Sequence, residues 1–126
     1  MDPEMKLSME NHAKQLNSLQ RETNVHVANR QKFDTQLNEN VNVIQELERL
    51  VESNKVFHMV GPILTRVELG EAKLTVNQRI SHIKNNILIL DDKLKKNEEE
   101  QKKHQLSIEK FKALQEKSNI NNQNGK

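Results

Sequence analysis

The sequence contains no cysteine, tryptophan or tyrosine, and only three glycines and two prolines occur among its 126 residues. Without cysteine the chain forms no disulfide and offers no thiol nucleophile and no cysteine zinc site. Aromatic residues make up 2% of the chain and hydrophobic residues 33%, which is less than a compact domain usually carries. The composition therefore predicts a thin apolar seam between helices and not a thick globular core.

The chain also lacks a basic stripe and a long apolar run. Its net charge is only +2, and acidic and basic residues are interspersed, as in the stretch from Asp91 to Lys103. Nucleic-acid-binding proteins usually segregate their basic residues on one face. No apolar run approaches the length of a membrane span, and the N-terminus lacks the basic and apolar regions of a signal peptide. We therefore expect a soluble cytoplasmic protein that binds neither nucleic acid nor membrane.

Glycine and proline are absent from residues 4 to 60 and from residues 71 to 124. Because these two residues are the main local punctuation of a chain, their positions predict a few long elements. We expect a mainly α fold in which two long helices form an antiparallel coiled coil and are joined by one β-hairpin. The expected bounds are helix over 4–52, hairpin over 55–67, helix over 70–118 and a disordered tail over 119–126.

Both predicted helices repeat apolar residues at the 3–4 spacing of a coiled-coil seam. In the first helix the seam positions hold Leu16, Leu19, Thr23, His26, Arg30, Phe33, Leu37, Asn40, Ile44, Leu47 and Val51. In the second helix they hold Val76, Ile80, Ile83, Ile87, Leu90, Leu94, Asn97, Gln101, His104, Ile108 and Phe111. Most of these positions are apolar, and each helix has a polar interruption.

The interruptions suggest a register in which Leu47 faces Ile80 and Thr23 faces His104. A slip by one heptad would set polar residues against apolar ones such as Leu16, and burying unpaired polar groups is costly. The seam is aliphatic near the hairpin and polar in its middle, so we expect the distal half to open at low cost.

The predicted hairpin is apolar on both faces, because strand side chains alternate and neither set is reliably polar. A two-stranded hairpin is marginal in water, and its edges are open to further pairing. We therefore predict that it assembles with other chains; the alternative is a hairpin folded down on its own coiled coil. The residues predicted to serve subunit assembly are Val56, Phe57, Met59, Val60, Gly61, Pro62, Ile63, Leu64 and Val67.

A family resemblance is carried by segments over the middle half of the chain: Asn54 to Leu64, Glu68 to Ala72, Arg79-Ile80, Arg30 to Lys32, Gln36-Leu37 and Glu39-Asn40. In these segments the chain resembles the prefoldins, specifically their β-type subunits, whose hairpins form a β-barrel. His58 and Thr65 are more polar than the resemblance implies for strands of such a barrel.

This resemblance implies a hexamer of two α-type and four β-type subunits whose hairpins form a double β-barrel carrying six coiled coils. The tips of the coils would hold non-native proteins, notably actin and tubulin, and pass them to the cytosolic chaperonin. It also implies that the protein uses no ATP or other cofactor and is not an enzyme.

Flexible apolar groups near the two helix ends suit such a holding function, since methionine in particular adapts to varied partners. The candidates for client binding are Met5, Leu7, Met9, Leu16, Leu19, Ile108, Phe111 and Leu114. The alternative is that several of them are simply coiled-coil core. The five histidines include no closely spaced pair in the sequence. His26 and His104 fall in adjacent predicted layers, which makes a metal conceivable, but a polar hinge layer is the preferred interpretation, and we expect no metal site. Two other function classes stay open: a coiled-coil adaptor or tether without chaperone activity, and a nucleic-acid accessory protein, against which the mixed charge argues.

Overall fold

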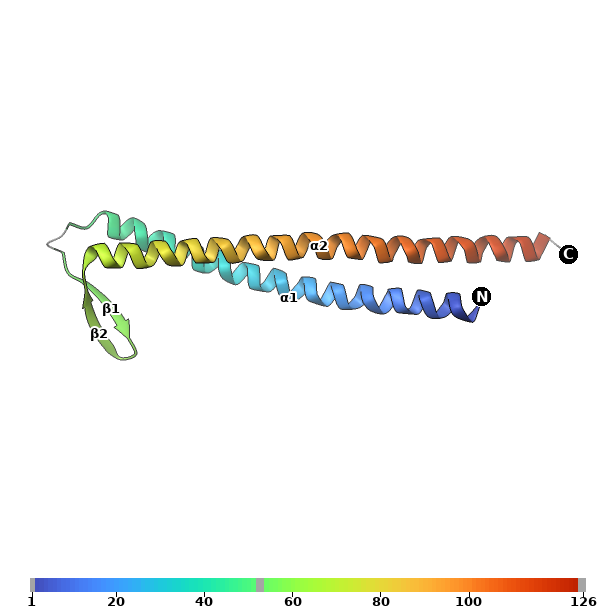
Figure 1. Cartoon of the computed structure of the whole chain (residues 1–126), viewed down its shortest axis with the longest axis horizontal. Coiled ribbons are helices and arrows are strands. Elements are labelled where there is room, and N and C mark those ends of the chain that lie inside the picture. The colour runs from blue at the N-terminus through green and yellow to red at the C-terminus, as the bar shows by residue number, and fades with distance from the viewer. Residues whose placement is uncertain (1, 52–53, 125–126) are drawn as a thin grey trace. The chain divides into compact units, whose positions relative to one another are not determined.

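The computed structural model describes residues 2–51 and 54–124. Helix α1 spans Pro3–Glu48, strand β1 spans Val56–Val60, strand β2 spans Ile63–Val67 and helix α2 spans Leu69–Asn124 (Figure 1). The predicted fold class is confirmed: two long helices are joined by a single antiparallel hairpin.

The sequence predicted that the first helix would end at residue 52, but helix α1 ends at Glu48. Its last turn tightens, because the amides of Arg49 and Leu50 bond three residues back, to Glu46 and Leu47, at 3.2 Å each. The Val51 amide then donates to the Asn54 side-chain oxygen at 2.8 Å. Residues 52 and 53 lie outside the described part of the chain.

Helix α2 continues to Asn124, so the tail predicted to be disordered from residue 119 is helical as far as it is described. The polar residues after Ser118 are weak helix formers, but glycine does not interrupt them until Gly125. Extending an existing helix by one residue avoids the cost of nucleation, which explains why the helix persists. Residues 125 and 126 are not described.

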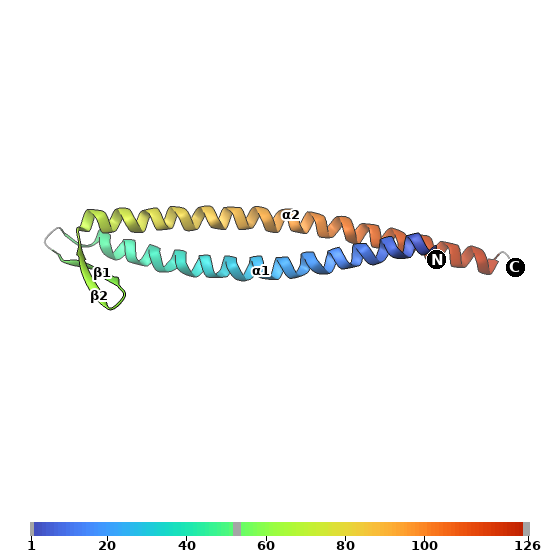
Figure 2. The same ribbon diagram turned by 60° about the horizontal axis from the view of Figure 1, so that its bottom comes forward.

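The chain divides into two compact units, which are described separately below. The hairpin unit is Ala28–Leu90, and the terminal unit combines Met1–Val27 with Asp91–Lys126. Within the hairpin unit, α1 and α2 lie side by side and enclose the main apolar cluster (Figure 2). Its buried members are Ile44, Leu47, Val76 and Ile80, with Leu37, Val41, Leu50, Val56, Leu69 and Ala72 packed against them.

The seam positions predicted for α2 are all buried or half-buried. The same is true of α1 except at Val51, which is 62% exposed because it lies beyond the end of the helix. The 3–4 spacing thus identified the inward face of each helix correctly.

The predicted register is wrong in the terminal unit. The Thr23 hydroxyl donates to the Asn97 side-chain oxygen at 2.9 Å, although the sequence argument placed His104 opposite it. The difference is one heptad. One cause is the asymmetric connector: residues 49–55 separate α1 from β1, whereas only Glu68 separates β2 from α2. The other cause is that the polar groups bond to one another, so the expected burial penalty does not arise.

The hairpin register pairs Val60 with Ile63 across a two-residue turn. Gly61 adopts a φ of 59°, and Pro62 follows it. A two-residue hairpin turn with glycine in the left-handed region at its first position matches the twist of the flanking strands. The turn therefore specifies the register of the whole hairpin.

Candidate functional site

The hairpin presents two apolar faces. Val56, His58 and Val60 stand opposite Val67, Thr65 and Ile63, so these six side chains share one face. Phe57 and Met59 stand opposite Arg66 and Leu64 on the other face.

Five large apolar side chains of the hairpin are between 52% and 66% exposed: Phe57, Met59, Val60, Ile63 and Leu64. Scattered apolar residues on a surface need no explanation, but a contiguous cluster of this kind marks an interaction site. Gly61 and Pro62 at the turn are also exposed, whereas Val56 and Val67 at the base are half-buried. Only the base of the hairpin therefore rests on its own helices.

A cleft of about 330 Å³ lies between the hairpin base and the helices of the same unit. Val56 and Phe57 line it on the β1 side, and Val43 and Val76 line it on the helix side. The sheet has two strands in the described residues, so each strand pairs along one side only. The other edge of each strand offers backbone donors and acceptors to a further strand.

In the terminal unit, a polar cluster joins the two helices. Asn97 is 6% exposed, yet its amide nitrogen donates to the Leu19 carbonyl at 3.1 Å. Its side-chain oxygen accepts from the Thr23 hydroxyl, which accepts in turn from the Gln101 amide at 2.9 Å. Gln101 also donates to Asn97. Among the described residues, no buried side-chain nitrogen or oxygen is left without a partner.

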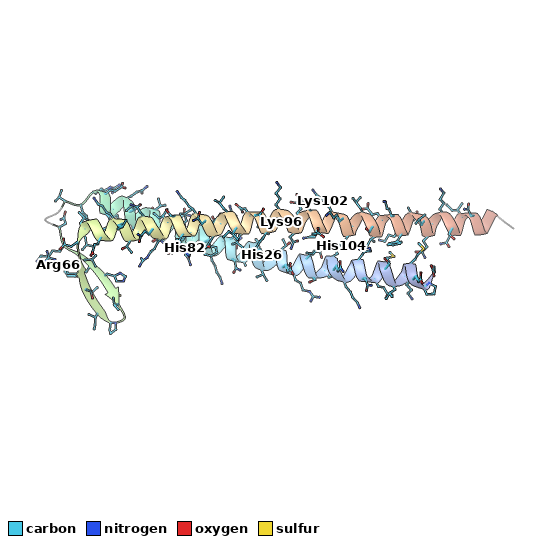
Figure 3. The ribbon with its side chains drawn as sticks, in the orientation of Figure 1. His26, Arg66, His82, Lys96, Lys102 and His104 are labelled. Carbon is cyan, nitrogen blue, oxygen red and sulfur yellow. The ribbon has the colours of Figure 1, made fainter. Side chains whose placement is uncertain are left out.

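A second polar contact, between His12 and His104, lies in the same unit. Their Nδ1 atoms are 2.8 Å apart and their ring centroids 5.1 Å apart. The Phe111 ring lies 6.1 Å from His12. Figure 3 labels His104 on the side of α2 next to α1.

Sequence reasoning missed this histidine pair, because it placed His104 opposite Thr23 and in the layer next to His26. The signal was nevertheless present. Continuing the 3–4 spacing from Leu16 toward the N-terminus gives positions 12, 9 and 5, and all three are half-buried. The correct register was the missing information.

The structure places most of the predicted client-binding residues along the seam of the terminal unit. Leu7 and Leu114 are exposed, at 60% and 54%. The others are half-buried: Met5, Met9, Leu16, Leu19, Ile108 and Phe111. A shallow groove of about 460 Å³ runs past Met9, Leu16 and Ile108. The half-buried residues therefore also serve as coiled-coil core in this structure, as the alternative interpretation of the sequence expected.

The described residues include no group of three His, Cys, Asp or Glu side chains placed to hold a metal ion. No described helix has the length and apolar character needed to cross a membrane. Two ion pairs on α2, Lys96 with Asp92 and Lys102 with Glu98, are formed by exposed side chains (Figure 3).

Comparison with known proteins decides the family. The model of the family described as prefoldin subunit matches residues 10–119, which include most of both units. A prefoldin subunit 6 from Arabidopsis thaliana is 32% identical over 108 residues, covering 86% of this chain and 84% of the relative. The chain belongs to the prefoldin subunit family. The resemblance to prefoldin seen in the sequence is confirmed.

The human and mouse prefoldin subunit 6 sequences are each 45% identical to the chain over 65 residues. Those 65 residues are 52% of the chain, and the chain spans about half the length of these two relatives. The crystal structure of the prefoldin beta subunit from Thermococcus strain KS-1 matches with a TM-score of 0.77. It covers 87% of this chain and 93% of that one at 22% identity, and so supports the β-type fold.

The matching family and these relatives are named as subunits, that is, as components of an assembly. The family therefore agrees with a hairpin whose apolar faces are not covered by its own chain.

Proposed function

We propose that this chain is a β-type subunit of a prefoldin hexamer that acts as an ATP-independent co-chaperone in the cytosol. Its hairpin joins the hairpins of α-type and β-type subunits in a β-barrel. Its helix ends hold non-native proteins of the actin and tubulin kind and deliver them to the cytosolic chaperonin. The protein does no catalysis and needs no cofactor.

The observation that carries this proposal is the hairpin surface, with five exposed apolar side chains and two open strand edges. Fully burying one such side chain contributes roughly 1.5–3 kcal/mol, so covering the set supplies ample driving force for assembly. A two-stranded hairpin alone is marginal in water, and pairing with further strands would stabilise it. Partner strands also provide the main-chain hydrogen bonds that the free edges lack.

The terminal unit supports the holding step. Leu7 and Leu114 are exposed to clients while the helix ends are paired. The half-buried Leu16 and Phe111 become exposed if the helix ends separate. Polar groups contribute much of the seam there, so separation uncovers less apolar area, and costs less free energy, than it would in the hairpin unit. Clients would compete with helix pairing for the same apolar groups.

Assembly is tested by co-expressing the chain with an α-type prefoldin subunit and measuring the native mass of the product. We expect a six-chain particle from the unchanged sequence and smaller species when Met59→Ser and Leu64→Ser are combined. Leu88→Ser is the matched control, since Leu88 is as exposed as Met59, at 66%, but lies on α2. A hexamer that survives the double substitution unchanged would contradict assembly through the hairpin.

Deleting residues 55–67 distinguishes the coiled-coil adaptor function from the proposed chaperone function. An adaptor that binds through a helix face, such as exposed Leu88 and Ile89, would keep its complexes after the deletion. The chaperone proposal expects those complexes to be lost.

Client holding is tested separately from assembly. Leu16→Ser and Phe111→Ser should leave the hexamer mass unchanged but weaken suppression of actin aggregation. Full suppression by that variant hexamer would contradict capture by these residues.

A further inference from the structure

The His12–His104 contact has a chemistry that the proposed function does not use. Two imidazoles joined through their Nδ1 atoms at 2.8 Å need one proton between them. One ring donates, and the other accepts with its own proton on Nε2. Zinc sites usually need three or four protein ligands, but a proton needs only these two nitrogens.

The contact depends on how many protons the pair holds. In the neutral pair, and with one ring charged, a donor still faces an acceptor. When both rings are charged, each Nδ1 carries a hydrogen, no acceptor is left, and two positive charges stand 2.8 Å apart. Histidine is the side chain whose charge changes between about pH 5 and 8.

Few groups near the two imidazoles could stabilise a second positive charge on the pair. No charged residue of α1 lies three or four positions from His12. On α2, Glu100 lies one turn before His104, and its carboxylate accepts from Lys103 Nζ at 3.2 Å. Glu109 and Lys112, of opposite charge, line the neighbouring groove. The apolar Phe111 ring closes another side of His12.

We propose that His12 and His104 form a proton-operated latch that holds the helix ends of the terminal unit together near neutral pH and releases them on acidification. Release uncovers the apolar seam residues on either side, Leu16 and Phe111. The consequence for client holding rests on the proposed function, whereas the opening itself does not. The polar cluster of Asn97 contains amides and a hydroxyl, which do not titrate in this range.

The natural sequence lacks cysteine, so spin labels can be placed selectively. Gln15→Cys and Gln105→Cys put one label on each helix at exposed positions near the pair. Distances between the labels are measured in the full chain, assembled with its partner subunits, at about pH 8 and about pH 5. We expect the ratio of separated to closed helix ends to rise on acidification on the order of tenfold, as expected for like charges this close.

His12→Gln and His104→Gln keep a donor and an acceptor but cannot be charged, so the response should disappear in either variant. His82→Gln is the matched control, because His82 is exposed on α2 in the other unit, and it should keep the full response. Circular dichroism confirms that each variant is helical. A wild-type chain that does not open on acidification, or a response that persists unchanged in the His12→Gln and His104→Gln variants, would overturn the latch.

The holding assay is run on the same samples. Stronger suppression of client aggregation at about pH 5, lost in His12→Gln, would join the latch to the proposed function. Opening without any change in holding would overturn that connection and leave the latch itself intact.

Discussion

The two units of the chain use the same helical pairing with different chemistry. In the hairpin unit, aliphatic side chains such as Ile44 and Ile80 form a continuous buried cluster. In the terminal unit, hydrogen bonds cross between the helices, from Thr23 to Asn97 and between His12 and His104. Burial of apolar side chains contributes much to stability and depends little on which apolar partner is present. Hydrogen bonds contribute less net stability but require a specific geometry. The comparison teaches that apolar burial holds one unit and specific polar contacts join the helices of the other, which we therefore expect to open more easily.

The largest expected effect is in the apolar unit. Leu47→Ala removes a side chain that is 8% exposed within the main cluster, and such truncations cost about 2–5 kcal/mol. Thermal unfolding followed by circular dichroism should show a clear loss of stability. Leu88→Ala, at an exposed position of α2, should stay within about 0.5 kcal/mol of the unchanged chain. Equal losses in both variants would remove the distinction between cluster and surface.

The polar cluster should show a smaller effect that spreads to its partners. Asn97→Ala leaves the Leu19 carbonyl, Thr23 and Gln101 without one bond each, at a cost of about 1–3 kcal/mol. Thr23→Val should cost less in that background than in the natural sequence, because the two side chains bond each other. Additive losses in the double-mutant cycle would show that the cluster does not act as a unit.

The hairpin turn allows a comparison between two glycines. Gly61 has a φ of 59°, so Gly61→Ala places a side chain in the left-handed region at a cost of about 1–2 kcal/mol. Gly70, in the first turn of α2, has open space where a Cβ would lie, and Gly70→Ala should be neutral or stabilising by up to about 1 kcal/mol. Both are measured as the denaturation midpoint of the assembled complex. A tolerated Gly61→Ala would mean that the turn does not specify the hairpin register.

The smallest effect is expected at the exposed ion pairs. Lys96→Ala removes a 3.0 Å contact to Asp92 between side chains that are mostly solvent-exposed. Such i,i+4 pairs contribute about 0.3–0.5 kcal/mol, and salt screens them. The difference in unfolding free energy should shrink further in high salt. A larger loss would mean that the outer face of α2 has a partner.

The sequence predicted the elements and their inward faces but not how the two helices align. The 3–4 spacing depends on one helix at a time, so it identified Val76, Asn97 and His104 as seam positions correctly. Alignment depends on the length of connector on each side of the hairpin and on which polar groups satisfy one another. The register shifted by one heptad was rejected because it would bury polar groups, yet Asn97 bonds to a backbone carbonyl and two side chains. The His12–His104 pair follows from that alignment and could not be predicted without it.

The candidate assembly surface was easier to identify than the helix ends. Gly61-Pro62 and the strand alternation gave the faces of the hairpin directly, and the exposed side chains agree with them. At the helix ends, the same seam residues serve packing in the closed state and are proposed to bind clients in the open state. A pattern of apolar positions is identical for both uses, so sequence alone does not separate them.

The central claim is that the apolar faces and open edges of the hairpin are completed by other prefoldin subunits. Hydrogen exchange at the backbone amides of residues 56–67, compared between the chain alone and its complex with an α-type subunit, tests it directly. The account predicts fast exchange in the free chain and strong protection of both strands in the complex. Complex formation with unchanged exchange across these residues would contradict it.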